Sequence, residues 1–251
     1  SFDWEVDGSS FTDTYTTYET GDTVDAGDTS GGEEWTCTVT PNDGTDDGAS
    51  SETSVTVPYS WDAVTAGGQH SCVLDASGSI SCWGLDNYGQ VANTPTGSGY
   101  TAISGGGYHS CALDSVGSIE CWGRDSAGQV SSTPSGSGYS ALSTGGDQAC
   151  AIDASGGIEC WGSDAWDQVS ETPSASNFTA VSSGWYHNCA IDNSDQITCW
   201  GRDDYGQVAD TPTTTDFAVI SSGAEHSCAL DSDGSLECWG CDDFDQVSDV
   251  P

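Results

Sequence analysis

Ten of the twelve cysteines recur in two series with a period of 39 residues, and the two members of each pair stand ten positions apart. Paired thiols can bind a metal ion or form a disulfide. Zinc-binding thiols usually have about two to four residues between them. The wider spacing favours five disulfides, each within one repeat. The pairs are Cys72 with Cys82, Cys111 with Cys121, Cys150 with Cys160, Cys189 with Cys199, and Cys228 with Cys238.

Four histidines occupy one position of the repeat, each followed by serine or asparagine. A ring of imidazoles could bind a metal ion, but the third repeat has Gln148 at this position. A side chain that recurs once per repeat is typical of a structural hydrogen bond, so we expect a structural role. No hydrolase, nucleotide-loop or zinc-protease motif is present, and we expect no enzymatic activity. The histidines are His70, His109, His187 and His226.

One acidic segment has the oxygen-rich spacing of a calcium loop. In residues 231–237, the side chains of Asp231, Asp233 and Glu237 place carboxylates at alternate positions. The segment lacks the third acidic position and the distance to a bidentate glutamate that complete such a loop. Aspartate and glycine are also ordinary residues of a hairpin turn. The sequence leaves calcium binding as an alternative to a turn, with the turn favoured.

Aromatic residues gather in two variable places of the repeat, where binding sites on repeat scaffolds commonly lie. One place follows each Trp-Gly pair, and the other comes just before the histidine. Exposed aromatic side chains mark contacts with proteins or sugars; the alternative is that they pack between repeats. The candidates are Tyr88, Trp166, Tyr205 and Phe244 in the first place, and Tyr108, Trp185 and Tyr186 in the second.

Short strands must position these side chains, because every repeat contains alternating runs broken by glycine. Residues 100–123 hold a short apolar run, a glycine break and two alternating runs around D-S-V-G-S. The pattern predicts a β-hairpin in which Gly117 supplies the positive φ of the turn. With the tip near residue 116, Cys111 and Cys121 lie opposite each other. A disulfide needs Cβ atoms about 3.5–4.5 Å apart, which favours the closer, non-hydrogen-bonded kind of pair.

The 39-residue period extends beyond the cysteines and divides residues 61–251 into five units. Each unit opens with an aromatic residue and has a tryptophan after its second cysteine, then a glutamine and a proline. A period of this length is the signature of stacked or ring-forming repeats. The recurring tryptophans are Trp83, Trp122, Trp161, Trp200 and Trp239, and the glutamines are Gln90, Gln129, Gln168, Gln207 and Gln246.

The unit reads G-x-x-H-S-C-A-L-D-x-x-G-x-I-x-C-W-G-x-D-x-x-G-Q-V and resembles the repeat of the regulator of chromosome condensation family. The third unit departs from it at Gln148 and Ala149. The resemblance implies an all-β propeller of five repeats over residues 59–251, with one four-stranded blade per repeat. Propellers of this family commonly have seven blades. With five units, either five short blades close a narrow ring or the chain is incomplete. The fifth unit ends at Pro251, just before the position of its next aromatic residue, and the first unit begins with that aromatic, Trp61. We therefore expect the N-terminal segment to supply the missing strand of blade five and close the ring.

Residues 1–58 lack the repeat and form a second predicted domain. Three strand-like runs, FDWEVDG, EEWTCTVTPNDG and SETSVTVP, are separated by turn residues. The segment resembles the C-terminal part of an immunoglobulin-like β-sandwich of bacterial surface proteins, with Trp4 and Cys37 as its packed tryptophan and cysteine. The strands that normally precede the tryptophan are missing. Either a neighbouring molecule supplies them by strand addition, or the upstream residues were removed.

The charge balance excludes several classes of partner. The chain has 40 acidic residues and only two basic ones, Arg124 and Arg202, for a formal net charge of −38. Such a chain cannot neutralise nucleic-acid phosphates or dock on an anionic membrane, and no apolar run is long enough for membrane insertion. Twelve cysteines favour an oxidising compartment, so we expect an extracellular or cell-surface protein.

Two functions follow as expectations. The first is a non-enzymatic structural protein that self-associates into a surface filament or layer through strand addition and disulfides. The second is an adhesin or binding module that recognises a protein or glycan through its aromatic residues. Cys37 and Cys241 lie outside the repeated pairs, and we expect them to pair with each other, within one chain or between chains.

Overall fold

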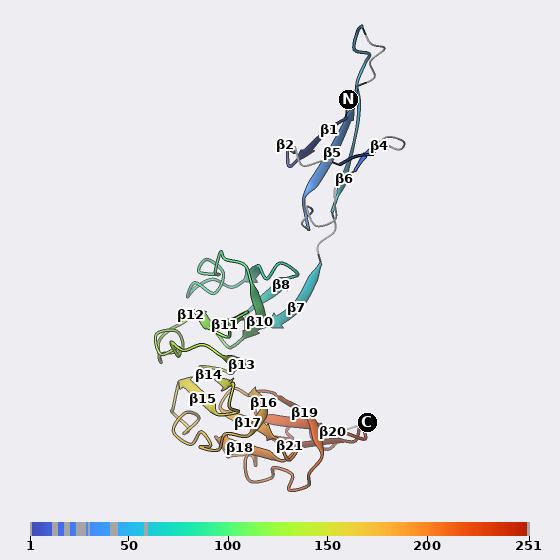
Figure 1. Ribbon diagram of the computed structural model, residues 1–251. Helices are drawn as coiled ribbons and strands as arrows, with labels where there is room; N and C mark the ends of the chain where they lie inside the picture. Colours follow the sequence, from blue (N-terminus) through green and yellow to red (C-terminus); the bar gives the residue numbers. More distant parts are fainter. Residues whose placement is uncertain are drawn as a thin grey trace. The chain divides into compact units, whose positions relative to one another are not determined.

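The computed structural model describes residues 2–11, 15–17, 21–23, 29, 31–40, 45–57 and 60–249. The chain divides into two compact units, Ser1–Ser60 and Trp61–Pro251. Both units are built from β-strands and connecting turns (Figure 1). No helix long and apolar enough to cross a membrane occurs in the described ranges.

The N-terminal unit contains a four-stranded antiparallel sheet in the order β2-β1-β5-β6, and the strand-like runs predicted there form β1, β5 and β6. Asp7 and Gly8 join β1 to β2 with φ angles of 46° and 75°, as a tight Asp-Gly hairpin requires. A separate hairpin pairs two further strands. The strands are β1 (Phe2–Val6), β2 (Ser9–Phe11), β3 (Tyr15–Thr17), β4 (Gly21–Thr23), β5 (Glu34–Val39) and β6 (Ser51–Thr56).

The core of this sheet is small and aromatic. Trp35 on β5 is buried and packs edge-on against Trp4 on β1, with ring centroids 6.4 Å apart. Trp4 lies opposite Cys37 in the register of β1 and β5. All residues of the edge strand β6 are exposed. The immunoglobulin-like assignment of this unit stays a prediction.

The C-terminal unit contains five antiparallel three-stranded sheets, one for each repeat, and in each sheet the second strand pairs with both others. The sheets are β7 (Trp61–Ala66), β8 (His70–Asp75) and β9 (Ile80–Gly84); β10 (Tyr100–Gly105), β11 (His109–Asp114) and β12 (Ile119–Gly123); β13 (Tyr139–Thr144), β14 (Gln148–Asp153) and β15 (Ile158–Gly162); β16 (Phe178–Ser183), β17 (His187–Asp192) and β18 (Ile197–Gly201); and β19 (Phe217–Ser222), β20 (His226–Asp231) and β21 (Leu236–Gly240).

The expectation of four strands per blade is wrong, because the chain after the third strand forms a loop that satisfies its own backbone. In the first repeat, the carboxylate of Asp86 accepts hydrogen bonds from the N–H groups of Val91 and Ala92 at 2.8 and 3.0 Å. The side-chain oxygen of Gln90 accepts another from the N–H of Tyr88 at 2.8 Å. Groups that are bound in this way cannot also join a strand ladder.

The five predicted disulfides are confirmed, and each joins the second and third strands of its sheet. Cys111 and Cys121 are direct partners in the register of β11 and β12, with Cα atoms 4.0 Å apart. The Cα separation in the other four pairs is 4.1 Å. These short separations fit the closer kind of antiparallel pair, so each bond holds one hairpin in register.

The hydrophobic core lies between consecutive repeats rather than within them. Trp239 and Phe217 of the fifth repeat pack against Cys189, Ile191 and Ile197 of the fourth. The indole N–H also crosses the boundary, donating to the main-chain carbonyl of the glutamine in the preceding repeat at 2.9–3.0 Å. The pairs are Trp122 with Gln90, Trp161 with Gln129, Trp200 with Gln168, and Trp239 with Gln207.

The expectation of a closed ring is also wrong, because within the described part of the chain no repeat lies against the outer side of the first or the fifth repeat. Trp83 in the first repeat is 50% exposed, whereas the equivalent tryptophans of the other repeats are 3–4% exposed. Leu230 in the fifth repeat is 39% exposed, against 2–3% for the residues equivalent to it. The fifth sheet contains only β19, β20 and β21 among the described strands.

Candidate functional site

Arg202 lies among aromatic rings from the two variable places of the repeat. Its guanidinium carbon is 5.0 Å from the ring centre of Trp166, 5.3 Å from that of Tyr186 and 5.4 Å from that of Tyr205. Trp166 comes from the preceding repeat, so the cluster spans the boundary between the third and fourth repeats. Distances of this size allow the cation to interact with the π-faces of the rings.

Two carboxylates also bind the same arginine. The guanidinium donates to Asp204 at 2.7 Å and to Glu225, in the fifth repeat, at 2.8 Å. The hydrogen bond to Asp204, followed by the charges of both carboxylates, raises the pKa of Arg202 above its usual value. The guanidinium is therefore a fixed positive charge that joins three repeats.

Arg124, at the same position two repeats before Arg202, forms a smaller cluster of the same kind. Its guanidinium carbon is 5.5 Å from the ring centre of Tyr88 and 5.7 Å from that of Tyr108. The two rings meet edge to face with centroids 5.7 Å apart. A nitrogen of Arg124 lies 3.4 Å from a carboxylate oxygen of Asp147 in the next repeat. Both arginines of the chain thus serve the same arrangement.

The structure brings five of the seven predicted binding aromatics against an arginine, and Trp185 packs on Tyr186 with ring centroids 6.2 Å apart. Packing leaves much of this surface open, because Trp166, Trp185 and Tyr205 are each 42–48% exposed. Phe244 is 87% exposed and makes no ring contact within the described residues. We call the surface the aromatic–arginine face; it consists of Tyr88, Tyr108, Arg124, Trp166, Trp185, Tyr186, Arg202 and Tyr205.

A hydrogen-bonded loop holds each exposed aromatic residue of the first place. In the third repeat, the N–H of Trp166 donates to the side-chain oxygen of Gln168 at 2.7 Å. The carboxylate of Asp164 accepts from the N–H groups of Val169 and Ser170, both at 2.9 Å. These bonds, with that from Ser170 the strongest, lower the pKa of Asp164. The loop therefore depends on an ionised aspartate.

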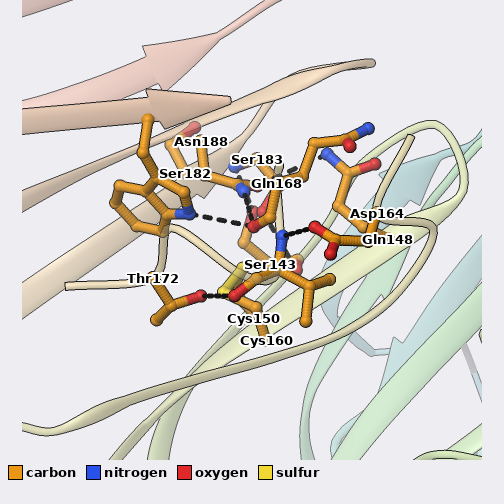
Figure 2. The surroundings of a disulfide bond; sticks show 12 residues. Ser143, Gln148, Cys150, Cys160, Asp164, Gln168, Thr172, Ser182, Ser183 and Asn188 are labelled. Carbon is orange, nitrogen blue, oxygen red and sulfur yellow. Dashed lines mark hydrogen bonds between the residues drawn. A yellow bond between two sulfur atoms is a disulfide. The ribbon is translucent and has the colours of Figure 1, made fainter. Parts of the chain in front are cut away.

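Figure 2 shows how this loop is tied to the next repeat. The main-chain carbonyl of Gln168 accepts from the side-chain amide of Asn188 at 3.0 Å and from the indole of Trp200 at 2.9 Å. The Cys150–Cys160 disulfide lies beside it and belongs to the cluster that contains Trp200 (Figure 2). Buried contacts between repeats therefore fix the loop that carries Trp166 of the aromatic–arginine face.

The repeated histidines form structural hydrogen bonds, as predicted, at two of the repeat boundaries. Nε2 of His70 lies 2.7 Å from the hydroxyl of Ser110, and Nε2 of His187 lies 2.8 Å from that of Ser227. Both serines belong to the following repeat. These hydrogen bonds join consecutive repeats. Because both histidines are buried, their rings are not accessible to a substrate.

His109 is the exception, because Ala149 replaces the serine of the following repeat. Neither of its ring nitrogens has a hydrogen-bond partner among the described residues. Burial, helped by the nearby imidazole of His70, lowers the pKa of His109 to about 4. The side chain is therefore neutral at physiological pH.

The segment considered for calcium is a hairpin turn. The carboxylate of Asp231 accepts from the N–H groups of Asp233 and Ser235 at 3.0 and 2.7 Å. Asp114 forms the same pattern at the turn of the second repeat, where the calcium-like spacing is absent. In the described part of the chain, neither Glu237 nor any other residue belongs to a cluster of three or more potential metal ligands. Asp231 here forms the hydrogen bonds of an ordinary hairpin turn.

A small hollow of about 220 Å³, which the sequence analysis did not predict, lies where the first strands of the repeats meet. Its lining includes one glycine of each repeat: Gly67, Gly106, Gly145, Gly184 and Gly223. A Cβ atom at Gly106 would lie 2.5 Å from the carbonyl oxygen of Gly145, so only glycine allows this approach. The sequence signal for this feature was the glycine that stands three residues before the histidine position in every repeat.

The order of strands, the tryptophan contacts and the repeat motif define an array of five similar repeats. The profile "Regulator of chromosome condensation (RCC1) repeat" matches residues 61–90, 100–129, 178–207 and 217–246. The predicted family resemblance is thereby confirmed over four repeats. The third repeat, with Gln148 and Ala149, lies outside the matched ranges.

Several solved structures are similar to this chain. The ectodomain of the Physcomitrella patens receptor kinase CR4 is 26% identical with a TM-score of 0.59, over 74% of this chain and 52% of that one. The CRINKLY WD40 ectodomain of the Arabidopsis thaliana receptor kinase ACR4 is 24% identical with a TM-score of 0.60, over 78% and 70%. Yeast RCC1, in its complex with Kap60, is 15% identical with a TM-score of 0.60, over 76% and 60%.

The likenesses below 25% identity show the fold alone. The chain spans about half the length of the Physcomitrella ectodomain. No match is found among the curated proteins.

Proposed function

We propose that this chain is a non-enzymatic extracellular binding module whose aromatic–arginine face recognises a cationic segment of a partner protein. The observation that carries the proposal is the set of half-exposed tryptophans and tyrosines gathered around two arginines. Tryptophan and tyrosine are the residues that most often dominate protein contacts. Here they are held in place before any partner arrives, which reduces the ordering that binding requires.

Charge favours a cationic partner. The chain has a formal net charge of −38, which attracts positive segments and repels negative ones over long distances. On the face itself, Asp147, Asp204 and Glu225 lie beside the aromatic rings. These carboxylates are already paired with Arg124 and Arg202, so a lysine or arginine of the partner would share them. Trp185, which is 48% exposed and has no arginine over its ring among the described residues, offers it a ring face.

Two observations support an extracellular location. Five disulfides are typical of proteins that mature in an oxidising compartment. The Physcomitrella protein that is 26% identical to this chain is a receptor ectodomain.

The test compares binding of a hexalysine peptide by calorimetry to the wild type and to the Trp166→Ala/Trp185→Ala double variant. Neither substitution changes the net charge, so the variant separates the face from simple charge attraction. We expect the dissociation constant to rise at least about tenfold, as for the loss of contact residues at a binding site. Val116→Ala, at an exposed hairpin tip, is the control. Equal binding by the double variant would show that charge alone attracts the peptide.

A second candidate function is self-association as a structural subunit, which the edge strand β6 favours. All six of its residues are exposed, and an exposed edge is a template for strand addition. A bond between Cys37 and Cys241 stays a prediction; Cys241 is buried and lies three positions after Cys238. If the Cys37–Cys241 bond links chains, non-reducing electrophoresis will show a ladder that the Cys241→Ser substitution abolishes. A single band with two titratable thiols would contradict this bond.

A further inference from the structure

We propose that the outer edge of the fourth sheet is a docking site for an extended, lysine-bearing segment of a partner protein, which adds to β18 as a fourth strand. The site lies within one repeat that has another repeat of the chain on either side. It shares no residue with the aromatic–arginine face. The proposal therefore goes beyond the proposed function and is tested separately from it.

The main chain of β18 has one edge that no other strand joins. Among the described strands, β18 pairs only with β17. Cys199 lies opposite Cys189 with Cα atoms 4.1 Å apart, which marks the closer, non-hydrogen-bonded kind of antiparallel pair. The N–H and C=O groups of Cys199 therefore point away from β17, as do those of Ile197 and Gly201 two positions to either side. Such a row of groups is a template for strand addition.

A groove of about 360 Å³ runs beside this edge. One wall contains residues 196–199, and the other contains residues 211–214. The second wall belongs to the segment that returns to the hairpin tip, where the N–H groups of Asp216 and Phe217 both donate to the carbonyl of Asp195 at 3.1 Å. This return segment forms no ladder with β18. The groove is therefore the place that a fourth strand would occupy.

The third repeat shows the same place closed. There, Gly157 and Ser176 form an antiparallel bridge between the return segment and the start of the third strand. The residues at the same positions of the fourth repeat are Gln196 and Thr215, and they form no bridge within the described chain. In the fourth repeat the return segment thus leaves the edge open.

Two exposed aspartates flank the groove at its hairpin end. Asp195 has a φ of 58° and Asp216 a φ of 96°. All four other repeats have glycine at the position of Asp195, and the first two have Gly99 and Gly138 at that of Asp216. Because a side chain rarely adopts a φ of 96°, the fourth repeat carries a carboxylate here against a conformational cost.

An extended segment with a lysine matches both features. Its main chain would pair with the edge of β18, and β-branched side chains suit such a half-buried place. Its ammonium group would meet Asp195 and Asp216, neither of which has an arginine partner among the described residues. The formal net charge of −38 attracts such a segment and repels an acidic one.

The test titrates the capped peptide KTVTVK into isotope-labelled protein in about 0.15 M sodium chloride, where the Debye length is about 8 Å. We expect the amide signals of Ile197, Cys199 and Gly201 to shift in the NMR spectrum. Two further peptides carry N-methyl groups on opposite alternating sets of residues. The set that faces β18 should raise the dissociation constant at least about tenfold, and the other set should not. Equal binding of both methylated peptides would overturn the strand pairing.

The charge is tested with the Asp195→Gly/Asp216→Gly double variant, for which the dissociation constant of KTVTVK should rise about fivefold. Its melting temperature should not fall, because glycine adopts these φ angles without strain, so weaker binding would not reflect unfolding. Asp167→Gly/Asp245→Gly removes two aspartates of equally positive φ outside the groove and should bind like the wild type.

Three results would contradict the proposal. They are no binding of KTVTVK to the wild type, equal dissociation constants for the two double variants, and tighter binding of the peptide SETSVT, the sequence of β6. The last result would assign the groove to a second copy of this chain. Signals that shift only near Trp166 and Trp185 would leave the aromatic–arginine face as the site of the peptide and would also overturn the present proposal.

Discussion

Trp200 in the fourth repeat and Trp83 in the first repeat occupy the same position of the same motif, but they have different surroundings. Trp200 is buried against the third repeat and donates its indole N–H to Gln168. Trp83 has no repeat before it and remains half exposed. The comparison shows that a single repeat of this chain does not contain its own core. Burial belongs to pairs of repeats, so the stability of the array is close to a sum over its boundaries.

The largest expected effect comes from removing the tryptophan at each place. Trp200→Ala should destabilise the protein by about 3–5 kcal/mol, because it leaves a cavity at a buried boundary and removes a hydrogen bond to Gln168. Trp83→Ala should destabilise the monomer by less than about 1 kcal/mol, as a surface substitution does. Urea unfolding followed by circular dichroism measures both. Equal losses would mean that the first repeat unfolds together with a partner surface, and the comparison above would fail.

Removing a disulfide should give the next largest effect. Both Cys189–Cys199 and Cys228–Cys238 close loops with a sequence separation of 10, for which chain entropy predicts about 3 kcal/mol. A double serine variant of either pair should therefore lose about this much free energy of unfolding. The Cys189 pair should lose more, because it also packs in the cluster with Trp239. Thermal unfolding of the two variants side by side measures the difference, and a greater loss for the terminal pair would contradict it.

The buried histidines predict a dependence on pH. Burial, followed by the charge of a neighbouring histidine, lowers the pKa of both His109 and His187 to about 4 from the usual 6.5. The unfolded chain therefore takes up protons first as the pH falls from 6.5 towards 4, and stability falls over that window. Above pH 6.5 neither state binds this proton, so no loss occurs.

His187→Gln places at this position the residue that the third repeat already has, Gln148. Between pH 7 and pH 4.5 the variant should lose about 2 kcal/mol less stability than the wild type, since one pKa unit corresponds to about 1.4 kcal/mol. Denaturant midpoints across this range provide the measurement. Carboxylates also begin to take up protons near pH 4.5, but they are the same in both proteins, so their contribution cancels in the difference. Parallel curves for the two proteins would contradict the assignment.

The smallest effect concerns the boundary between the second and third repeats. Ala149→Ser should restore a hydroxyl opposite His109, as Ser227 provides for His187, and should stabilise the protein by about 1 kcal/mol. Ala151→Ser is the matched control, because Ala151 is equally buried in the same strand but faces no histidine in the repeat pattern. It should destabilise the protein by leaving a hydroxyl unpaired. Differential scanning calorimetry resolves both signs, and a loss in both variants would show that the site has no room for a hydroxyl.

Local features of this fold could be predicted from the sequence, and contacts between repeats could not. The register of Cys111 and Cys121 follows from a single turn, because every residue that sets it lies within one hairpin. The missing fourth strand was not predicted, because it depends on side chains such as Asp86 that bind the backbone of their own loop. Ring closure was predicted wrongly, because the curvature of the array is set by the contacts between repeats and not by any single repeat.

The candidate site divides in the same way. Its aromatic residues were predicted from their variable places in the repeat, where the scaffold tolerates change. Their arrangement around the arginines was not predicted, because Arg124 meets Tyr88 of the preceding repeat and no local pattern indicates that meeting. The departure of the third repeat at Gln148 and Ala149 was visible in the sequence. Its effect on His109, which lacks a hydrogen-bond partner among the described residues, was not predicted, because that histidine faces the following repeat.

The arginine clusters have a consequence for how proteases can cut the folded chain. Enzymes that cut after basic residues need an extended arginine or lysine, and this sequence offers them only Arg124 and Arg202. In the folded chain, Arg202 is clamped by Asp204 and Glu225, and Arg124 lies against two tyrosines. Proteolysis after either residue therefore requires the repeats on both sides to separate. Trypsin would act on this protein as a probe of its unfolding, releasing fragments that end at residues 124 and 202.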